Sequence, residues 1–345
     1  MEIKTFDERR KTLVKKIIAA CGLVLIFGIA VVLVILSVNK HKEEEYLKTY
    51  GMTALTVGEN EVTYDIYRCL YLNYRDELEA SYTTDGVTDT AALDSDIRAR
   101  ILNDIRYMYA VVSLAGEHGL STTSSDVIAV ADTFIEEMKV FCKDNGMDFD
   151  KKLADGYMTE QAFVFFQRVN ALADVLFTAL VEDGGAIEND DAKVLEFLNG
   201  DDFAKIISIF VENDAGEDVE ENRRRAAEAL EKYKSGTDFA TLIGQYCEEV
   251  PGGEAYIMRG EREAAFDSAA FALEEGEVSD VVECDDGFYI ILRLKKDEAH
   301  IADKFEQFKS TYQSLTFENK IKARANSLVA TESDYVRALS YEEIR

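Results

Sequence analysis

Few residues of this 345-residue chain have the chemistry of metal ligands, nucleophiles or proton carriers, and they are widely scattered. The HExxH, GxSxG and GxGxxG patterns and the phosphate-binding loop are absent. The three histidines are His41, His118 and His300. The sequence therefore argues against a zinc site or a catalytic triad, and it predicts no metal and no cofactor.

The cysteines show no C-x-x-C or other metal-ligand spacing. Four of them follow the apolar N-terminal segment: Cys69, Cys142, Cys247 and Cys284. We expect buried free thiols at these positions, and one disulfide is the alternative in an oxidising compartment.

The stretch from Phe266 to Val282, FDSAAFALEEGEVSDVV, carries a more informative pattern. Its first half spaces apolar residues as a short helix does, Gly276 ends that helix, and its second half alternates as a strand does. A catalytic function for this stretch depends on the elements that surround it.

Those elements begin near residue 202. The apolar run AKIISIFV (204–211) predicts a strand, and two helices follow, the second with Asp238 as its N-cap. The short strand EAYIM precedes the Phe266 helix, and the strands VSDVVEC and FYIILRL follow it around a DDG turn. The order β-α-α-β-α-β-β predicts a compact α+β domain over residues 202–297, because a Rossmann unit would not end in a hairpin.

This domain resembles the parvulin family of peptidyl-prolyl cis/trans isomerases. The matching residues are DFATLIGQY, Gly252-Gly253-Glu254, Arg259-Gly260, FDSAAFALEEGEVSDVV, and Gly287 with YIILRL. The resemblance implies rotation about X-Pro bonds, which needs no covalent nucleophile. A dry pocket grips the proline ring, and a nearby donor draws off amide character from the planar peptide bond.

The resemblance assigns three site residues on the sheet and the helix. Phe266 matches the aromatic floor of the proline pocket, although a purely structural core role is the alternative. Ile206 and Tyr289 occupy positions where the family usually has histidines. Tyr289 keeps a hydrogen-bonding hydroxyl in the site, and Ile206 does not.

Two further positions come from the loops. Arg262 replaces a methionine or leucine that usually precedes the floor residue, and the family's central cysteine or aspartate falls near Glu248 or Glu249. We therefore expect catalytic roles for Tyr289 and Glu249, and substrate-binding roles for Phe266, Ile206, Arg262 and Met258.

Two functions remain open because both family histidines are absent. The first is a membrane-anchored, extracytoplasmic isomerase and foldase that acts on exported polypeptides with X-Pro bonds. The second is a binding chaperone, or holdase, whose parvulin domain is catalytically reduced. A scaffold role at the membrane is a third, weaker candidate, and the sequence makes no prediction of oligomeric state.

The rest of the chain predicts an acidic protein with a membrane anchor. Its formal net charge is −29, from 67 acids and 38 bases, which argues against nucleic-acid binding. The 22 residues between Lys16 and Asn39 carry no charge and are long enough to cross a bilayer. Because six bases precede them, the positive-inside rule predicts a cytoplasmic tail (1–16), a transmembrane helix (17–38) and an extracytoplasmic remainder.

Two processing alternatives compete with that anchor. A cleaved signal peptide would have a shorter apolar region and a small-x-small site after it. Cys21 could be a lipid-modified cysteine, but the apolar run continues well beyond it, so we favour a thiol embedded in the helix.

A helical domain is expected over residues 61–200, after a linker at 39–60. Its first helix begins at Thr63, and others are predicted near 91–118, 123–144 and 159–183. A tyrosine stripe on the first helix is either a sticky surface for unfolded chains or, as we prefer, a half-buried packing face. The stripe consists of Tyr64, Tyr67, Tyr71 and Tyr74.

Residues 298–345 are expected to form a C-terminal helix, from Ile301 to about Leu339, that packs on the helical domain. This layout resembles the extracytoplasmic foldases of the PrsA and SurA families, in which an isomerase module is inserted into a helical chaperone domain.

Overall fold

The computed structural model describes residues 48–344 apart from 85, 183, 214–218 and 248–253. These residues form two compact units. The first contains the described residues up to Leu180 together with those from Lys320 onward, and the second spans Val181–Asn319. The predicted transmembrane helix, Cys21 and His41 lie outside the described residues.

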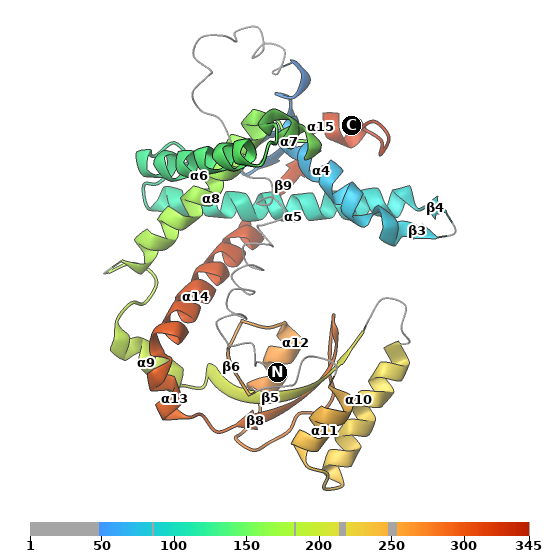
Figure 1. The fold of residues 1–345 in the computed structure, drawn as a ribbon, viewed down its shortest axis with the longest axis vertical. Coiled ribbons are helices and arrows are strands. Elements are labelled where there is room, and N and C mark those ends of the chain that lie inside the picture. Colours follow the sequence, from blue (N-terminus) through green and yellow to red (C-terminus); the bar gives the residue numbers. More distant parts are fainter. Residues whose placement is uncertain (1–47, 85, 183, 214–218, 248–253, 345) are drawn as a thin grey trace. The chain divides into compact units, whose positions relative to one another are not determined.

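The first unit is mostly helical, and its long helices lie where the sequence predicts them (Figure 1). Its elements are β1 (Thr53–Val57), β2 (Asn60–Thr63), α4 (Tyr64–Leu78), the short 3-10 helix η1 (Glu79–Tyr82), β3 (Thr83–Thr84), β4 (Val87–Thr88), α5 (Thr90–Glu117), α6 (Ser125–Asp144), α7 (Phe149–Asp155), α8 (Glu160–Val181), β9 (Ala330–Glu332) and α15 (Asp334–Ala338).

Within the described residues, α8 alone is long and apolar enough to cross a membrane by length and composition. Its Phe163 and Phe166 are at most 1% exposed and belong to the core of the first unit, together with side chains of α4 and α5. Because these apolar side chains pack against other helices of the unit, we interpret α8 as a core helix.

The tyrosine stripe of α4 is a packing face, as preferred from the sequence. Tyr67 and Tyr71 are 0% exposed, so their rings cannot act as a surface for unfolded chains. Each hydroxyl is satisfied by a carboxylate: Tyr67 donates to Glu332 at 2.6 Å, and Tyr71 donates to Asp94. Such partners are expected, because a buried hydroxyl without one is costly.

The C-terminal segment differs from the single helix expected over 301–339. It forms α13 (Glu298–Asp303), α14 (Phe305–Ser327), the strand β9 and the short helix α15. β9 pairs antiparallel with β1, which gives a three-stranded sheet in the order β2-β1-β9. The chain passes from the second unit into the first along α14.

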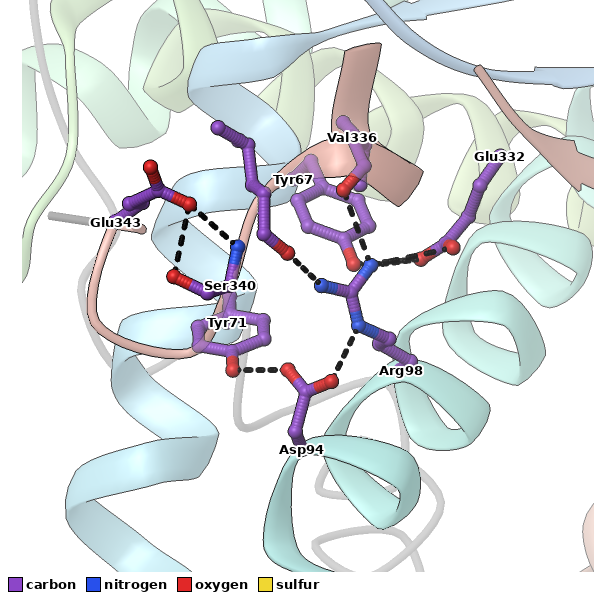
Figure 2. Close-up of polar contacts among 9 residues, drawn as sticks. Tyr67, Tyr71, Asp94, Arg98, Glu332, Val336, Ser340 and Glu343 are labelled. Atoms are coloured by element: carbon purple, nitrogen blue, oxygen red, sulfur yellow. Dashed lines mark hydrogen bonds and ion pairs between the residues drawn. The ribbon is translucent and has the colours of Figure 1, made fainter. Parts of the chain in front are cut away.

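Arg98 of α5 holds this segment in place (Figure 2). Its guanidinium pairs with Asp94 at 2.8 Å and with Glu332 of β9 at 3.2 Å. It also donates to the carbonyl oxygens of Val336 at 3.3 Å and Leu339 at 2.9 Å, near the end of α15. One partly buried cation thus satisfies acceptors on the strand β9 and at the end of the helix that follows it.

The second unit contains the predicted α+β domain. Its elements are α9 (Asp191–Asn199), β5 (Phe203–Glu212), α10 (Val219–Lys234), α11 (Phe239–Tyr246), β6 (Ala255–Met258), α12 (Ala264–Ala270), β7 (Val282–Cys284), β8 (Gly287–Leu294), α13 and the first part of α14. From β5 to β8 the order is β-α-α-β-α-β-β, which confirms the prediction. The predicted strand VSDVVEC is shorter, since only β7 and a single bridge from Val278 to Leu292 form.

The sheet has the order β6-β5-β8-β7 with antiparallel neighbours, and helices cover both faces (Figure 1). Ile207 and Ile209 of β5 face α10 and α11, whereas Ile206 and Phe210 face α12. The alternation explains why β5 reads as a continuous apolar run, since both of its faces are covered. The predicted site residues lie on the α12 face.

Candidate functional site

Three of the predicted site residues meet on the α12 face of the sheet. The Phe266 ring meets Tyr289 of β8 edge-on, with 5.0 Å between centroids and 89° between planes. Tyr289 also stacks on Phe210 of β5 at 4.5 Å. Ile206 belongs to the same cluster and is 2% exposed. These buried side chains form an aromatic and aliphatic cluster, the kind of lining expected for a site that binds a pyrrolidine ring.

The turn between β6 and α12 fixes where Phe266 stands. Gly260 has a φ of +88°, in the left-handed region that favours glycine, and its N–H donates to the carboxylate of Asp267. Glu261 accepts a hydrogen bond from the N–H of Met258 at 2.9 Å. Two carboxylates therefore hold the turn, and α12 begins immediately after it with Phe266 in its first turn.

Phe266 itself is 2% exposed, so the ring is covered in this structure. Arg262 lies over it, with its Cζ 5.2 Å from the ring centroid. Arg262 is exposed, and a cation over an aromatic face at such a site contributes only about 0.5–1 kcal/mol. The ring also packs within the buried cluster that contains Ile206 and Tyr289, so a proline ring reaches it only if side chains of that cluster move together with Arg262.

Met258 does not join this group. Met258 lies in another cluster, with Phe203 and Phe308, because side chains on β6 alternate between the two faces. The β6 residue that lies with Phe266 is Ile257, which sequence reasoning missed although the alternation in EAYIM was a usable signal. Glu249 lies outside the described residues.

Sequence reasoning also missed a polar edge beside Phe266. The hydroxyl of Tyr289 donates to Asp286 at 2.8 Å. Cys284 of β7 is in the Phe266 cluster. Burial, and then the nearby carboxylates of Glu263 and Asp286, raise the pKa of the Cys284 thiol to about 11. At neutral pH this sulfur is therefore a protonated thiol and a poor nucleophile.

The ligand atoms of Glu263, Cys284 and Asp286 lie within 4.8 Å of one another, which is close enough to surround a cation. Glu263, however, accepts a hydrogen bond from the N–H of Asp285 at 3.0 Å. Asp286 accepts the hydrogen bond that the Tyr289 hydroxyl donates. The thiol favours its protonated form, so we assign these residues no metal role.

Comparison with known proteins agrees with this geometry. Residues 207–295 match the rotamase family model, described as the PPIC-type PPIase domain. The chain carries a parvulin-type PPIase domain. The matched region begins in β5 and ends just after β8, so it includes Phe266 and Tyr289 and leaves out Ile206.

Similarity to curated relatives extends beyond that domain. A foldase protein PrsA of Halalkalibacterium halodurans is 25% identical over 206 residues, which are 56% of this chain and 60% of that protein. Foldase protein PrsA 3 of Bacillus cereus is 37% identical over 82 residues, 22% of this chain and 29% of that protein. The chain thus spans about 60% or less of the length of these relatives.

Among solved structures, PrsA from Bacillus anthracis is similar with 17% identity and a TM-score of 0.37, covering 65% of this chain and 96% of that one.

Proposed function

We propose that this protein is a membrane-anchored foldase whose parvulin-type domain isomerises X-Pro bonds in polypeptides outside the cytoplasm. The observation that carries the proposal is the domain match over residues 207–295, with Phe266, Tyr289 and Ile206 gathered on one sheet face. The foldase role is supported by similarity to proteins named PrsA.

The chemistry asked of this face is modest. Uncatalysed rotation about the X-Pro bond has a barrier of about 18–20 kcal/mol. To accelerate it a thousandfold, the domain must bind the twisted peptide about 4 kcal/mol more tightly than the planar one. Phe266, Ile206 and Ile257 provide a dry apolar surface, which disfavours the polar, planar ground state. The Tyr289 ring contacts Phe266, and its hydroxyl donates to Asp286 in this structure. We assign this hydroxyl the donor role, in which it would exchange Asp286 for the substrate amide.

The anchor and the domain layout belong to the same proposal. The uncharged segment at 17–38 would hold the chain in the membrane with residues 1–16 in the cytoplasm. Residues 61–200 would bind unfolded segments, residues 202–297 would isomerise their prolines, and residues 298–345 would complete the helical part. Polypeptides with X-Pro bonds are the proposed partners.

A binding chaperone is the second candidate, and two observations favour it. An apolar Ile206 stands where the family usually has a histidine, and Phe266 is covered by Arg262 in this structure. A domain of this kind would dock proline segments and protect them from aggregation without accelerating their isomerisation.

The two candidates differ in one measurable rate. The full chain in detergent micelles is added to a short proline peptide displaced from its cis/trans equilibrium, and in parallel to a denatured protein that aggregates on dilution. Faster relaxation of the peptide supports the isomerase. Relaxation at the rate of buffer, together with suppressed aggregation, would replace the isomerase by the binding chaperone.

A further inference from the structure

Arg262 is a cation beside Phe266 that forms no ion pair with another described residue. Among the described residues, no carboxylate oxygen lies within 4.0 Å of its guanidinium, whose one recorded contact is with the Phe266 ring. The matching position in the parvulin family is usually an uncharged methionine or leucine. This chain therefore has a positively charged side chain where the family usually has an uncharged one.

The acids nearest to Arg262 in the sequence are used elsewhere. Glu261 accepts from the N–H of Met258, Glu263 accepts from the N–H of Asp285, and Asp267 accepts from the N–H of Gly260. Each carboxylate accepts a hydrogen bond from a backbone N–H, and none lies within 4.0 Å of the guanidinium, although the charge of Arg262 still acts on Glu261 and Asp267. The local sequence thus surrounds Arg262 with acids, yet none of these three forms an ion pair with it within 4.0 Å.

Other exposed arginines of the second unit are paired. Arg223 lies 2.8 Å from Glu283, Arg224 lies 2.5 Å from Glu221, and Arg259 lies 2.5 Å from Asp202. Because the chain has 67 acidic and 38 basic residues, we expect most of its arginines to lie near a carboxylate. Within the described part of the second unit, Arg262 therefore differs from these arginines in forming no ion pair, and it lies at the proposed proline site.

We propose that Arg262 makes the domain selective for X-Pro bonds that have an acidic side chain next to the proline. This inference rests on the proposed function and specifies its substrate class. When the proline ring packs on Phe266, it displaces the guanidinium and removes the cation–π contact. A neighbouring Asp or Glu of the client then pairs with the displaced cation, whereas a neighbouring Lys is repelled.

The expected preference is about threefold, the effect of one partly exposed ion pair. The net charge of −29 opposes it, because the chain as a whole repels acidic peptides. At 0.15 M salt the Debye length is about 8 Å, so charges beyond that distance are largely screened and the nearby guanidinium dominates. The measurement therefore belongs at physiological ionic strength.

The test uses the full chain in detergent micelles at 0.15 M salt and four peptides. Three differ only in the residue before proline, Ala-Glu-Pro-Phe, Ala-Lys-Pro-Phe and Ala-Ala-Pro-Phe, and a fourth has Glu after the proline. Both the affinity and the cis/trans exchange rate are measured by NMR. Arg262→Met removes the charge, and Arg224→Met is the matched control because it removes an exposed arginine from α10.

Wild type should favour the better of the two Glu peptides over the Lys peptide about threefold, in rate or in affinity. Arg224→Met should keep that ratio, and Arg262→Met, with its fold checked by tyrosine circular dichroism, should reduce it to about one. Equal values for the Glu and Lys peptides in wild type, or a ratio that survives Arg262→Met, would overturn the proposal.

Failure of the proposed catalysis gives a different result. If no peptide is accelerated but a Glu peptide binds more tightly than the Lys peptide in an Arg262-dependent way, catalysis is wrong and the selectivity stands. If the chain neither binds nor accelerates any of the four peptides, both proposals are contradicted.

Discussion

Replacing Arg98 by methionine should loosen the attachment of β9 and α15 to the rest of the first unit. The guanidinium pairs with Asp94 and Glu332 and donates to two carbonyl oxygens after β9 (Figure 2). Methionine fills a similar volume but provides none of these contacts. The two carboxylates would then lie partly buried with no cation between them.

The cost follows from the burial of the network. The Arg98 side chain is 15% exposed, Glu332 is 12% and Asp94 is 26%. Removing one partner of a buried ion pair typically costs about 3–5 kcal/mol, and the partial exposure favours the lower value. A loss of about 3 kcal/mol in the free energy of opening should raise amide exchange in β9 roughly 100-fold.

The assay is hydrogen exchange followed by mass spectrometry on peptides covering residues 328–339, because the chain has no tryptophan to report unfolding. Arg100→Met is the control on the same helix, since Arg100 is 44% exposed and pairs with Asp96 at 3.1 Å. It should change exchange in β9 less than about fivefold. Unchanged protection of β9 in Arg98→Met, or equal effects of both variants, would refute the role assigned to Arg98.

Two further predictions test the fold. Burial raises the pKa of Asp104 from 3.8 to about 6, so the folded protein loses stability, by at most about 3 kcal/mol, as the pH rises from about 4 to 6 and this carboxyl ionises. Asp104→Asn should remove that decline and raise the unfolding free energy at pH 7.5. Urea titrations at several pH values would measure both effects. At Gly287, where φ is +151°, a Cβ would lie 2.8 Å from the Phe210 ring, so Gly287→Ala should lower the unfolding free energy by about 2–4 kcal/mol. At Gly276, where φ is +88°, a Cβ would meet open space, so Gly276→Ala should lower it by only about 1–2 kcal/mol. A Gly287→Ala melting temperature equal to that of Gly276→Ala would contradict this reading of the strand.

The sheet of the second unit was predictable because its signals are local. β5 and β8 read as apolar runs, and the spacing around Phe266 encodes α12. β9 was not predictable in this way, because Ala-Thr-Glu has no strand pattern of its own. Its conformation comes from pairing with β1, which lies more than 270 residues earlier in the chain.

The part of the candidate site that depends on local spacing was predicted from the sequence, and the part that depends on side-chain direction was not. Motif spacing places Phe266 and Tyr289 on facing elements, and the structure brings their rings to 5.0 Å. Which residue of β6 joins them depends on the direction of its side chain, and that selects Ile257 and not Met258. The Arg262 side chain lies over Phe266, four residues further along, and this orientation depends on the turn into α12, which the sequence pattern did not specify.

The central claim is that an X-Pro bond rotates against the Phe266 ring. Its most direct test is the NMR exchange rate of Ala-Ala-Pro-Phe with the full chain in micelles, comparing wild type with Phe266→Leu and with Phe239→Leu. Phe239 is a matched control because it is a buried phenylalanine on the opposite face of the same sheet. We expect acceleration proportional to protein concentration, lowered about fivefold or more by Phe266→Leu and little changed by Phe239→Leu. Exchange at the rate of buffer, or an equal loss in both variants, would contradict the claim.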